Sequence, residues 1–144
     1  MPRRRKFVAQ VLAGTAAMCC VRPLALAAHG KPDPKWYEAA VAMRRLAESW
    51  GDQSYGAVLV ADGIVVGEGP SRVVKDKNPD AHAERVAIVD AQRRLGRESL
   101  AGSILYSTSR PCSLCEAAAF RARVSRMYFG PALQDAGSPA GRAQ

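Results

Sequence analysis

Three residues of this chain have the types and the spacing to hold one metal ion. The chain contains two histidines and four cysteines, and His82, Cys112 and Cys115 stand in the segments DAHAE (80–84) and PCSLC (111–115). An imidazole and two thiolates are ligands that zinc prefers. Structural zinc sites normally have four protein ligands, so a set of three leaves the open position that a catalytic zinc ion needs. The sequence therefore predicts one catalytic zinc ion per chain, against the alternative of a buried histidine and two structural thiols.

Glu84 is the candidate for acid–base chemistry beside this metal. It follows His82 by two residues, which places it near the ion without making it a ligand. A carboxylate in that position can accept a proton from water and deliver it to a reacting group. The alternative is an ordinary acidic residue at a helix N-terminus, where the helix dipole favours negative charge. The fixed spacing from the histidine favours proton transfer.

The first 27 residues are typical of an export signal. A basic segment at 3–6 precedes an apolar run at 7–21, and the segment ALA at 25–27 fits a cleavage site. The run is shorter than the roughly 20 residues of a membrane-spanning helix. The segment RRKFV at 4–8 resembles a twin-arginine signal. We therefore expect a periplasmic protein that is exported folded, with zinc already bound, and that has no stable membrane insertion after cleavage.

Two alternatives remain for this N-terminal segment. It could be a retained amphipathic or membrane-anchoring helix, or Cys19 or Cys20 could be the acylated residue of a lipoprotein. The signal also carries much of the positive charge. Five of the 21 basic residues precede residue 28, which leaves 16 basic and 13 acidic residues in the rest of the chain. The overall net charge of +8 therefore does not by itself indicate nucleic-acid binding.

After a polar linker at 28–34, the apolar pattern predicts alternating helices and strands. Helical spacing predicts a helix over 36–49, and Asp62-Gly63 predicts a two-residue turn in a hairpin. Gly96 is the predicted C-cap of the second helix. The hairpin strands are expected over 55–61 and 64–67, the later helices over 81–95 and 112–122, and the later strands over 104–107 and 126–129.

This order predicts an α/β domain over residues 35–130 in which helices pack on a sheet. It places His82 and Glu84 at the start of one helix and the two cysteines at the start of another. Two helix N-termini directed at one ion would stabilise thiolates. The tail at 131–144 is rich in alanine, glycine and proline, and we expect it to be mobile.

Between residues 51 and 130 the chain resembles the cytidine deaminase-like superfamily, and within it the branch of guanine deaminases and tRNA adenosine deaminases. His-x-Glu followed by Pro-Cys-x-x-Cys is the signature of zinc-dependent nucleobase deaminases. The other segments that carry the resemblance are GDQSYGAV (51–58), GEG (67–69), NPDAHAE (78–84), RARV (121–124) and MYFG (127–130).

The resemblance implies a three-layer α/β/α fold with a mixed central sheet. It also implies a hydrolase that releases ammonia from a nucleobase, a nucleoside or a related small amino-heterocycle. Zinc would be held by His82, Cys112 and Cys115, Glu84 would be the catalytic residue, and the main chain near Ala83 would hold the ring edge. The resemblance also allows for a homodimer.

Three features depart from the pattern of this branch. Ser71 stands, by spacing, where the branch has an asparagine that reads the base, so Ser71 is the candidate substrate-binding residue or else a solvated loop serine. A serine offers one hydroxyl in place of the donor and acceptor pair of an amide. Arg110 replaces a glutamate before Pro111-Cys112. The C-terminal helix and strand of the family look shortened or missing.

Three function classes follow from these residues. The first is a hydrolytic deaminase of a free base or small heterocycle, with guanine as the first expectation. The second is an editing enzyme of the tRNA adenosine deaminase type, against which the export signal argues because tRNA is cytoplasmic. The third is a non-enzymatic zinc domain that has lost its substrate pocket, against which the intact Glu84 argues.

Overall fold

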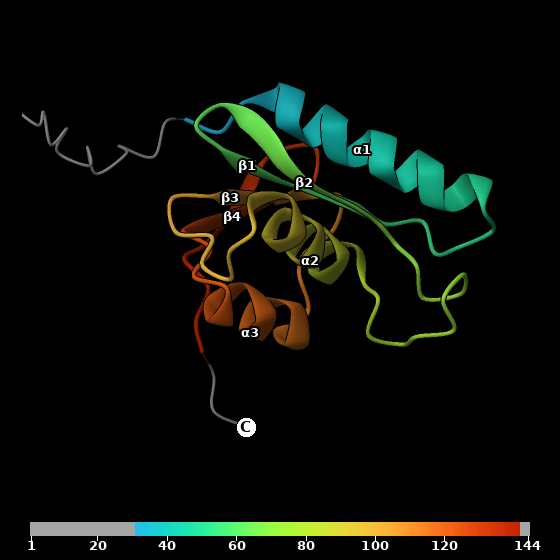
Figure 1. Cartoon of the computed structure of the whole chain (residues 1–144). Coiled ribbons are helices and arrows are strands. Elements are labelled where there is room, and N and C mark those ends of the chain that lie inside the picture. The colour runs from blue at the N-terminus through green and yellow to red at the C-terminus, as the bar shows by residue number, and fades with distance from the viewer. Residues whose placement is uncertain (1–30, 142–144) are drawn as a thin grey trace, which may run out of the picture.

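A mixed five-stranded sheet lies at the centre of the structure, a computed structural model that describes residues 31–141 (Figure 1). The export signal expected over residues 1–27 lies outside the described residues. The strands follow the order β2-β1-β3-β4-β5, with β3 and β4 parallel and the other neighbours antiparallel. The elements are α1 (Pro34–Ser49), β1 (Gly56–Ala61), β2 (Ile64–Pro70), α2 (Ala83–Leu95), β3 (Ile104–Ser107), α3 (Ser113–Arg121), β4 (Arg126–Phe129) and β5 (Gln134–Gly137).

The two faces of the sheet carry different helices, as Figure 1 shows. Successive side chains of a strand point to opposite faces, so each strand contributes to two cores. One core joins Val58, Val60, Tyr106 and Tyr128 of the sheet to Ala40 of α1. The other joins Ala57, Leu59, Leu105 and Met127 to buried residues of α2 and α3. The expected three-layer α/β/α arrangement with a mixed sheet is therefore confirmed.

The topology brings the N-termini of α2 and α3 to one edge of the sheet. Strands β2 and β3 are both antiparallel to β1, so they run in the same direction as each other. α2 connects β2 to β3, and α3 connects β3 to its parallel neighbour β4. Parallel strands need such crossover connections, and each crossover helix here begins beyond the carboxyl end of a strand. The residues at the starts of both helices consequently face the same region of space.

Two glycines of β2 let α2 lie directly on the sheet. A Cβ atom on Gly69 would be 2.0 Å from the carbonyl oxygen of Ala83, and one on Gly67 would be 2.3 Å from that of Ala87. Real Cβ atoms do not approach a backbone oxygen so closely, so any side chain at these positions would displace the helix. The glycines therefore fix the distance between the first turn of α2 and the sheet.

The predicted turns are confirmed. Asp62 and Gly63 have φ values of 50° and 72°, as a two-residue hairpin turn with two left-handed positions requires. Gly96 caps α2 in the left-handed conformation. The strand that was expected to end at residue 67 continues to Pro70, and the helix expected from residue 81 begins at Ala83.

The expectation of a mobile tail from residue 131 is wrong for the part of that tail that the structure describes. β5 pairs antiparallel with β4, and Arg126 of β4 forms an ion pair with Asp135 of β5. Pro139 is buried, and the main-chain N–H of Ala140 donates to Glu116 of α3 at 3.2 Å. The segment QDAG lacks the β-branched and aromatic residues typical of strands, so pairing with β4 rather than local preference makes it a strand.

Membrane-crossing helices are absent from residues 31–141, since none of the helices there combines the length and the hydropathy that a span requires.

Candidate metal centre and cavity

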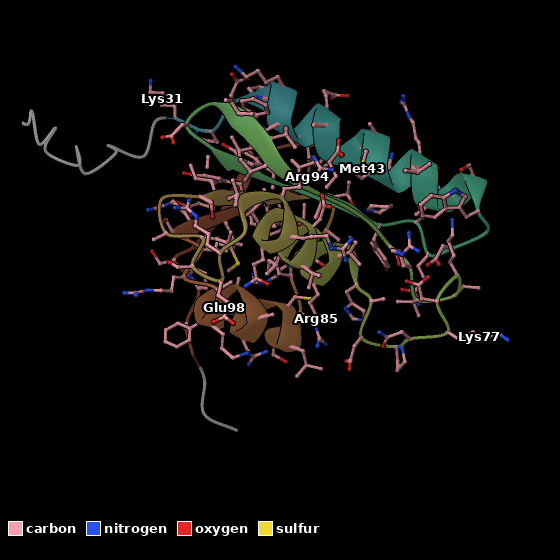
Figure 2. All side chains as sticks on the ribbon, in the orientation of Figure 1. Lys31, Met43, Lys77, Arg85, Arg94 and Glu98 are labelled. Carbon is pink, nitrogen blue, oxygen red and sulfur yellow. The ribbon has the colours of Figure 1, made fainter. Side chains whose placement is uncertain are left out.

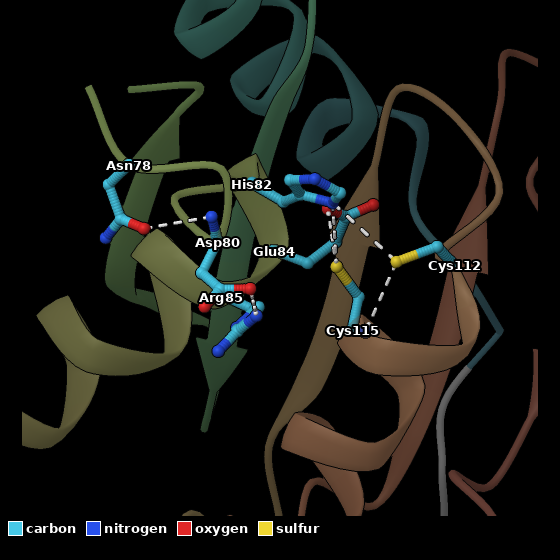
Figure 3. Close-up of polar contacts among 7 residues, drawn as sticks. All are labelled: Asn78, Asp80, His82, Glu84, Arg85, Cys112 and Cys115. Atoms are coloured by element: carbon cyan, nitrogen blue, oxygen red, sulfur yellow. Dashed lines mark hydrogen bonds and ion pairs between the residues drawn. The ribbon is translucent and has the colours of Figure 1, made fainter. Parts of the chain in front are cut away.

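The first turn of α2 presents His82 and Glu84 toward α3. His82 is the N-cap residue of α2, and its side chain makes no capping hydrogen bond, so the imidazole is free to face the cysteines. The preceding loop is fixed by two contacts: the N–H of Asp80 donates to the Asn78 side chain at 2.9 Å, and Arg85 pairs with Asp80 at 2.7 Å (Figure 3). This bracing holds the chain where it enters the helix.

The start of α3 presents the two cysteines. Cys112 is the N-cap residue, and its sulfur accepts a hydrogen bond from the main-chain N–H of Cys115 at 3.4 Å. Pro111 precedes the cap, and Cys115 follows one turn later, so both sulfurs lie on the same side of the helix. Cys115 is buried, whereas Cys112 is exposed.

The three predicted ligands converge (Figure 3). Nδ1 of His82 lies 3.6 Å from Sγ of Cys112 and 3.5 Å from Sγ of Cys115. All three ligand atoms lie within 4.8 Å of one another. A tetrahedral zinc ion with bonds of about 2.0–2.1 Å to nitrogen and about 2.3 Å to sulfur would hold its ligands roughly 3.6 Å apart. The donor set and its spacing therefore fit a zinc ion, and within residues 31–141 it is the one such group of three potential ligands.

Glu84 lies behind this triangle in a buried position. Its side chain is only 6% exposed, and Oε2 is 3.5 Å from Sγ of Cys115. Burial raises the pKa of the Glu84 carboxyl, because a low-dielectric environment disfavours the charged form. Burial, followed by the neighbouring carboxylate, also raises the pKa of the Cys115 thiol. A divalent cation would stabilise the deprotonated form of both groups, so the pair suits a cation better than it suits an empty protein interior.

A cavity of about 260 Å³ opens beside the triangle. Pockets for drug-sized ligands usually measure about 300–1,000 Å³, so this cavity suits a group no larger than a single heterocyclic base. Its lining residues come from the segment before β1, from the start of α2 and from the loop before α3: Gln53, Tyr55, His82, Ala83, Glu84, Ser109, Arg110 and Cys112. Ala83, expected near the substrate ring, is therefore at the cavity wall.

Ser71 lies elsewhere. It is fully buried, its hydroxyl donates to Asp52 at 2.9 Å, and its N–H donates to the carbonyl of Tyr55. Ser71 is absent from the cavity wall. Asp52 also accepts from the main-chain N–H groups of Val74 and Lys75. The structure thus places Ser71 in a network that ties the loop after β2 to the segment before β1.

Four residues of the cavity wall were not expected from the sequence: Gln53, Tyr55, Ser109 and Arg110. Gln53 and Tyr55 lie in the segment between α1 and β1, and Ser109 and Arg110 directly precede the Pro-Cys pair. For Ser109 and Arg110, the position next to the metal motif is a signal from which a place at the site could have been predicted. No residue-type pattern signalled Gln53 and Tyr55, because the fold alone brings them to the site.

A second, larger cavity of about 630 Å³ lies between α1, β2 and α2, away from the metal ligands. Met43 of α1 and Arg85 and Arg94 of α2, labelled in Figure 2, are among its lining residues. Arg85 pairs with Asp80, and Arg94 pairs with Glu68 and Asp90. Its arginines are thus largely neutralised, and its size alone does not make it the reactive site.

Comparison with known proteins agrees with this geometry. Residues 31–131 match the sequence family described as "Cytidine and deoxycytidylate deaminase zinc-binding region", a segment that contains all three ligands and Glu84. The chain belongs to this zinc-dependent deaminase family. The family is described by its zinc-binding region, and the His/Cys/Cys triangle lies within the matched segment and fits a zinc ion.

Individual relatives belong to two types of deaminase. The chain is 32% identical over 103 residues to the tRNA-specific adenosine deaminase of Buchnera aphidicola subsp. Schizaphis graminum, covering 72% of this chain and 68% of that protein. It is 38% identical over 82 residues to the guanine deaminase of Bacillus subtilis, covering 57% and 53%. A solved structure from a study of A-to-I editing by tRNA:A34 deaminases superposes with a TM-score of 0.66 at 38% identity, covering 68% of this chain and 71% of that chain.

The match does not extend over the full length of these proteins. The chain spans from 53% to 68% of the length of six bacterial relatives, five of them tRNA-specific adenosine deaminases and one the guanine deaminase. The family is thus shown, while the reaction and its substrate belong to the proposal that follows.

Proposed function

We propose that this protein is a zinc-dependent hydrolase that replaces the exocyclic amino group of a heterocyclic base with oxygen and releases ammonia. The observation that carries the proposal is the convergence of three potential zinc ligands at a cavity of single-base size, whose wall contains Glu84 and two of the ligands, His82 and Cys112. A zinc ion held by His82, Cys112 and Cys115 would activate water as a nucleophile by lowering its pKa. The triangle is expected to bind one ion per chain.

Glu84 is the group that moves protons. Hydrolysis adds one water molecule across the carbon–nitrogen bond, and both of its protons must reach nitrogen atoms. One proton goes to a ring nitrogen as the ring carbon becomes tetrahedral, and the other goes to the departing amino group, which leaves as ammonia. Glu84 lines the cavity and contacts the ligand Cys115, so one carboxylate can accept each proton and deliver it in turn.

The cavity wall supplies the groups that would orient the base. The main chain of Ala83 lies beside the metal ligands at the wall. The ring of Tyr55, which is 46% exposed, offers an aromatic surface at the entrance on which a base can stack. Gln53 adds an amide with both donor and acceptor capacity.

Two substrate classes are supported, and the activities of the relatives indicate which of the two to place first. Most of the relatives compared are tRNA-specific adenosine deaminases, and the matching editing structure is of the same type. We therefore place an adenosine in tRNA first and free guanine, our expectation from the sequence, second. The guanine deaminase of Bacillus subtilis supports the latter.

The test is product formation by the zinc-loaded protein. Incubation with tRNA transcripts, followed by analysis for inosine, examines the first class, and ammonia release from guanine, guanosine and cytosine examines the second. We expect product from at least one of these substrates and none from protein stripped of metal. Absence of product from all of them, in protein with full zinc content, would favour the non-enzymatic zinc domain.

A further inference from the structure

Arg110 stands at the entrance of the cavity without an acidic partner. It lines the cavity together with Glu84 and Cys112, and its side chain is exposed. Its guanidinium carbon lies 5.7 Å from the centre of the Phe129 ring in β4, a distance typical of a cation–π contact. The ring thus holds the guanidinium at the entrance while its hydrogen-bond donors remain available.

Of the eleven arginines in residues 31–141, Arg110 is one of six that form no ion pair, and it is the one arginine that lines this cavity. Five others form ion pairs with nearby acids: Arg44, Arg72, Arg85, Arg94 and Arg126. No acidic group of residues 31–141 lies within ion-pair distance of Arg110. Apart from the metal ligands, Glu84 and Arg110 are the charged residues of the cavity wall. Glu84 is buried, so the entrance presents a positive charge.

From this placement we propose that Arg110 binds a phosphate group of the substrate, so that the preferred substrate is a phosphate-bearing nucleotide instead of a free base. The inference rests on the proposed deaminase function. A cavity of about 260 Å³ holds the base but not the sugar and phosphate, which must remain at the entrance. A guanidinium there can bind two phosphate oxygens at once. The phosphate is that of a free mononucleotide or of an RNA chain.

If Arg110 has a purely structural role, in which it packs on the Phe129 ring, the expected result is different. Loss of this packing contact would weaken the binding of phosphorylated and unphosphorylated ligands alike. Loss of a phosphate contact would weaken the binding of the phosphorylated ligand alone. The ratio of the two affinities therefore separates the interpretations.

The experiment measures ligand binding to zinc-loaded protein that also carries Glu84→Gln, so that no ligand is consumed. Dissociation constants are determined for adenosine and adenosine 5′-monophosphate, for guanosine and guanosine 5′-monophosphate, and for a short single-stranded RNA. Each dissociation constant is measured for the protein with Arg110 unchanged, for the Arg110→Gln variant and for the Arg110→Lys variant. Arg97→Gln, at an exposed arginine outside the cavity wall, is the matched control for loss of one positive charge. Thermal melting and zinc content confirm that each variant is folded.

We expect a monophosphate or the RNA to bind about tenfold or more tightly than the nucleoside, as a charge-assisted hydrogen bond provides. Arg110→Gln should abolish this preference, Arg110→Lys should retain part of it, and Arg97→Gln should retain it fully. A preference confined to the RNA identifies a phosphodiester as the source of the phosphate. Equal affinities in the parent protein, or a preference that survives Arg110→Gln, would overturn the proposal.

Deamination assays on the parent protein separate this result from the proposed function. Ammonia release from unphosphorylated substrates, with no effect of Arg110→Gln on the affinity ratio, would leave the deaminase function standing and remove the role of Arg110. Phosphate binding that depends on Arg110, without release of ammonia or formation of inosine, would retain the binding site and remove the deaminase function.

Discussion

At the scale of single residues, the buried pair of Glu84 and Cys115 is the feature most sensitive to metal. Cys115 is fully buried and its sulfur is 3.5 Å from Glu84. Burial disfavours the charged forms of both groups, and a bound cation favours them, so zinc binding should stabilise the folded chain. We expect a chelator to lower the melting temperature by at least about 4 °C, corresponding to roughly 1 kcal/mol, and added zinc to restore it.

The control for metal removal is a variant that lacks Cys112, the exposed metal ligand. Cys112→Ser should abolish the response to chelator and to zinc, because the ion then lacks one of its thiolates. A melting temperature that is the same with chelator and with zinc in the parent protein would count against the triangle as a zinc site.

Ser71 gives a second prediction at this scale. Its hydroxyl donates to Asp52, and Ser71 is not among the residues of the cavity wall, so we expect its role to be to hold the loop after β2. Ser71→Ala should lower the free energy of unfolding by about 1 kcal/mol and change ligand affinity less than twofold. Urea unfolding and ligand titration measure the two effects. A tenfold loss of affinity with unchanged stability would instead make Ser71 a substrate-binding residue, as its spacing in the sequence suggested.

At the scale of elements, the contact between β2 and α2 holds two site residues in place. A Cβ atom on Gly69 would meet the backbone of α2 at 2.0 Å, so Gly69→Ala must push the helix outward. We expect a loss of stability of about 3 kcal/mol, at the upper end of overpacking effects, together with weaker zinc binding. Denaturant unfolding and metal titration measure both.

Gly130→Ala is the matched control for that substitution. Gly130 has a φ of 72° and open space around its Cβ position, so alanine there costs only the left-handed conformation, about 1–2 kcal/mol. Its zinc affinity should be unchanged. Equal stability losses in the two variants, with zinc binding retained in both, would contradict the proposed role of the β2–α2 contact.

The elements also show which parts of the fold are predictable from local sequence. The hairpin turn at Asp62-Gly63 and the cap at Gly96 follow from residues that adopt left-handed backbone conformations. β5 is not predictable from local sequence, because its segment QDAG becomes a strand only by pairing with β4. The metal ligands were predictable because their types and spacing are specific to zinc. Tyr55 reaches the cavity through the course of the chain before β1, which no local pattern encodes.

At the scale of the whole molecule, export and substrate constrain each other. We propose that the segment RRKFV at 4–8 and the cleavage-like segment at 25–27 direct the folded, zinc-loaded protein to the periplasm. A periplasmic enzyme would not meet cytoplasmic tRNA, so export would reverse the order of substrates proposed above and place the free base or mononucleotide first. Retention in the cytoplasm would favour tRNA.

Changing Arg4 and Arg5 to lysine tests the export proposal. If the twin-arginine route carries the protein, the double variant should accumulate in the cytoplasm, whereas the parent chain should be found in the periplasm. Cell fractionation with detection of the protein measures the distribution. Lys31→Arg, outside the signal, is the control. An equal distribution of both forms would exclude the twin-arginine route.

The central claim is that Glu84 carries protons at a zinc site, and Glu84→Gln tests it most directly. Glutamine is nearly isosteric, so the fold and the zinc content should be retained. Because an amide cannot accept and deliver the two protons, turnover on a confirmed substrate should fall by at least about 10²-fold, the low end of general acid–base contributions. The measurement is the rate of product formation per zinc-loaded chain. Full turnover by Glu84→Gln at unchanged zinc content would contradict the account, since another group would then have to supply the protons.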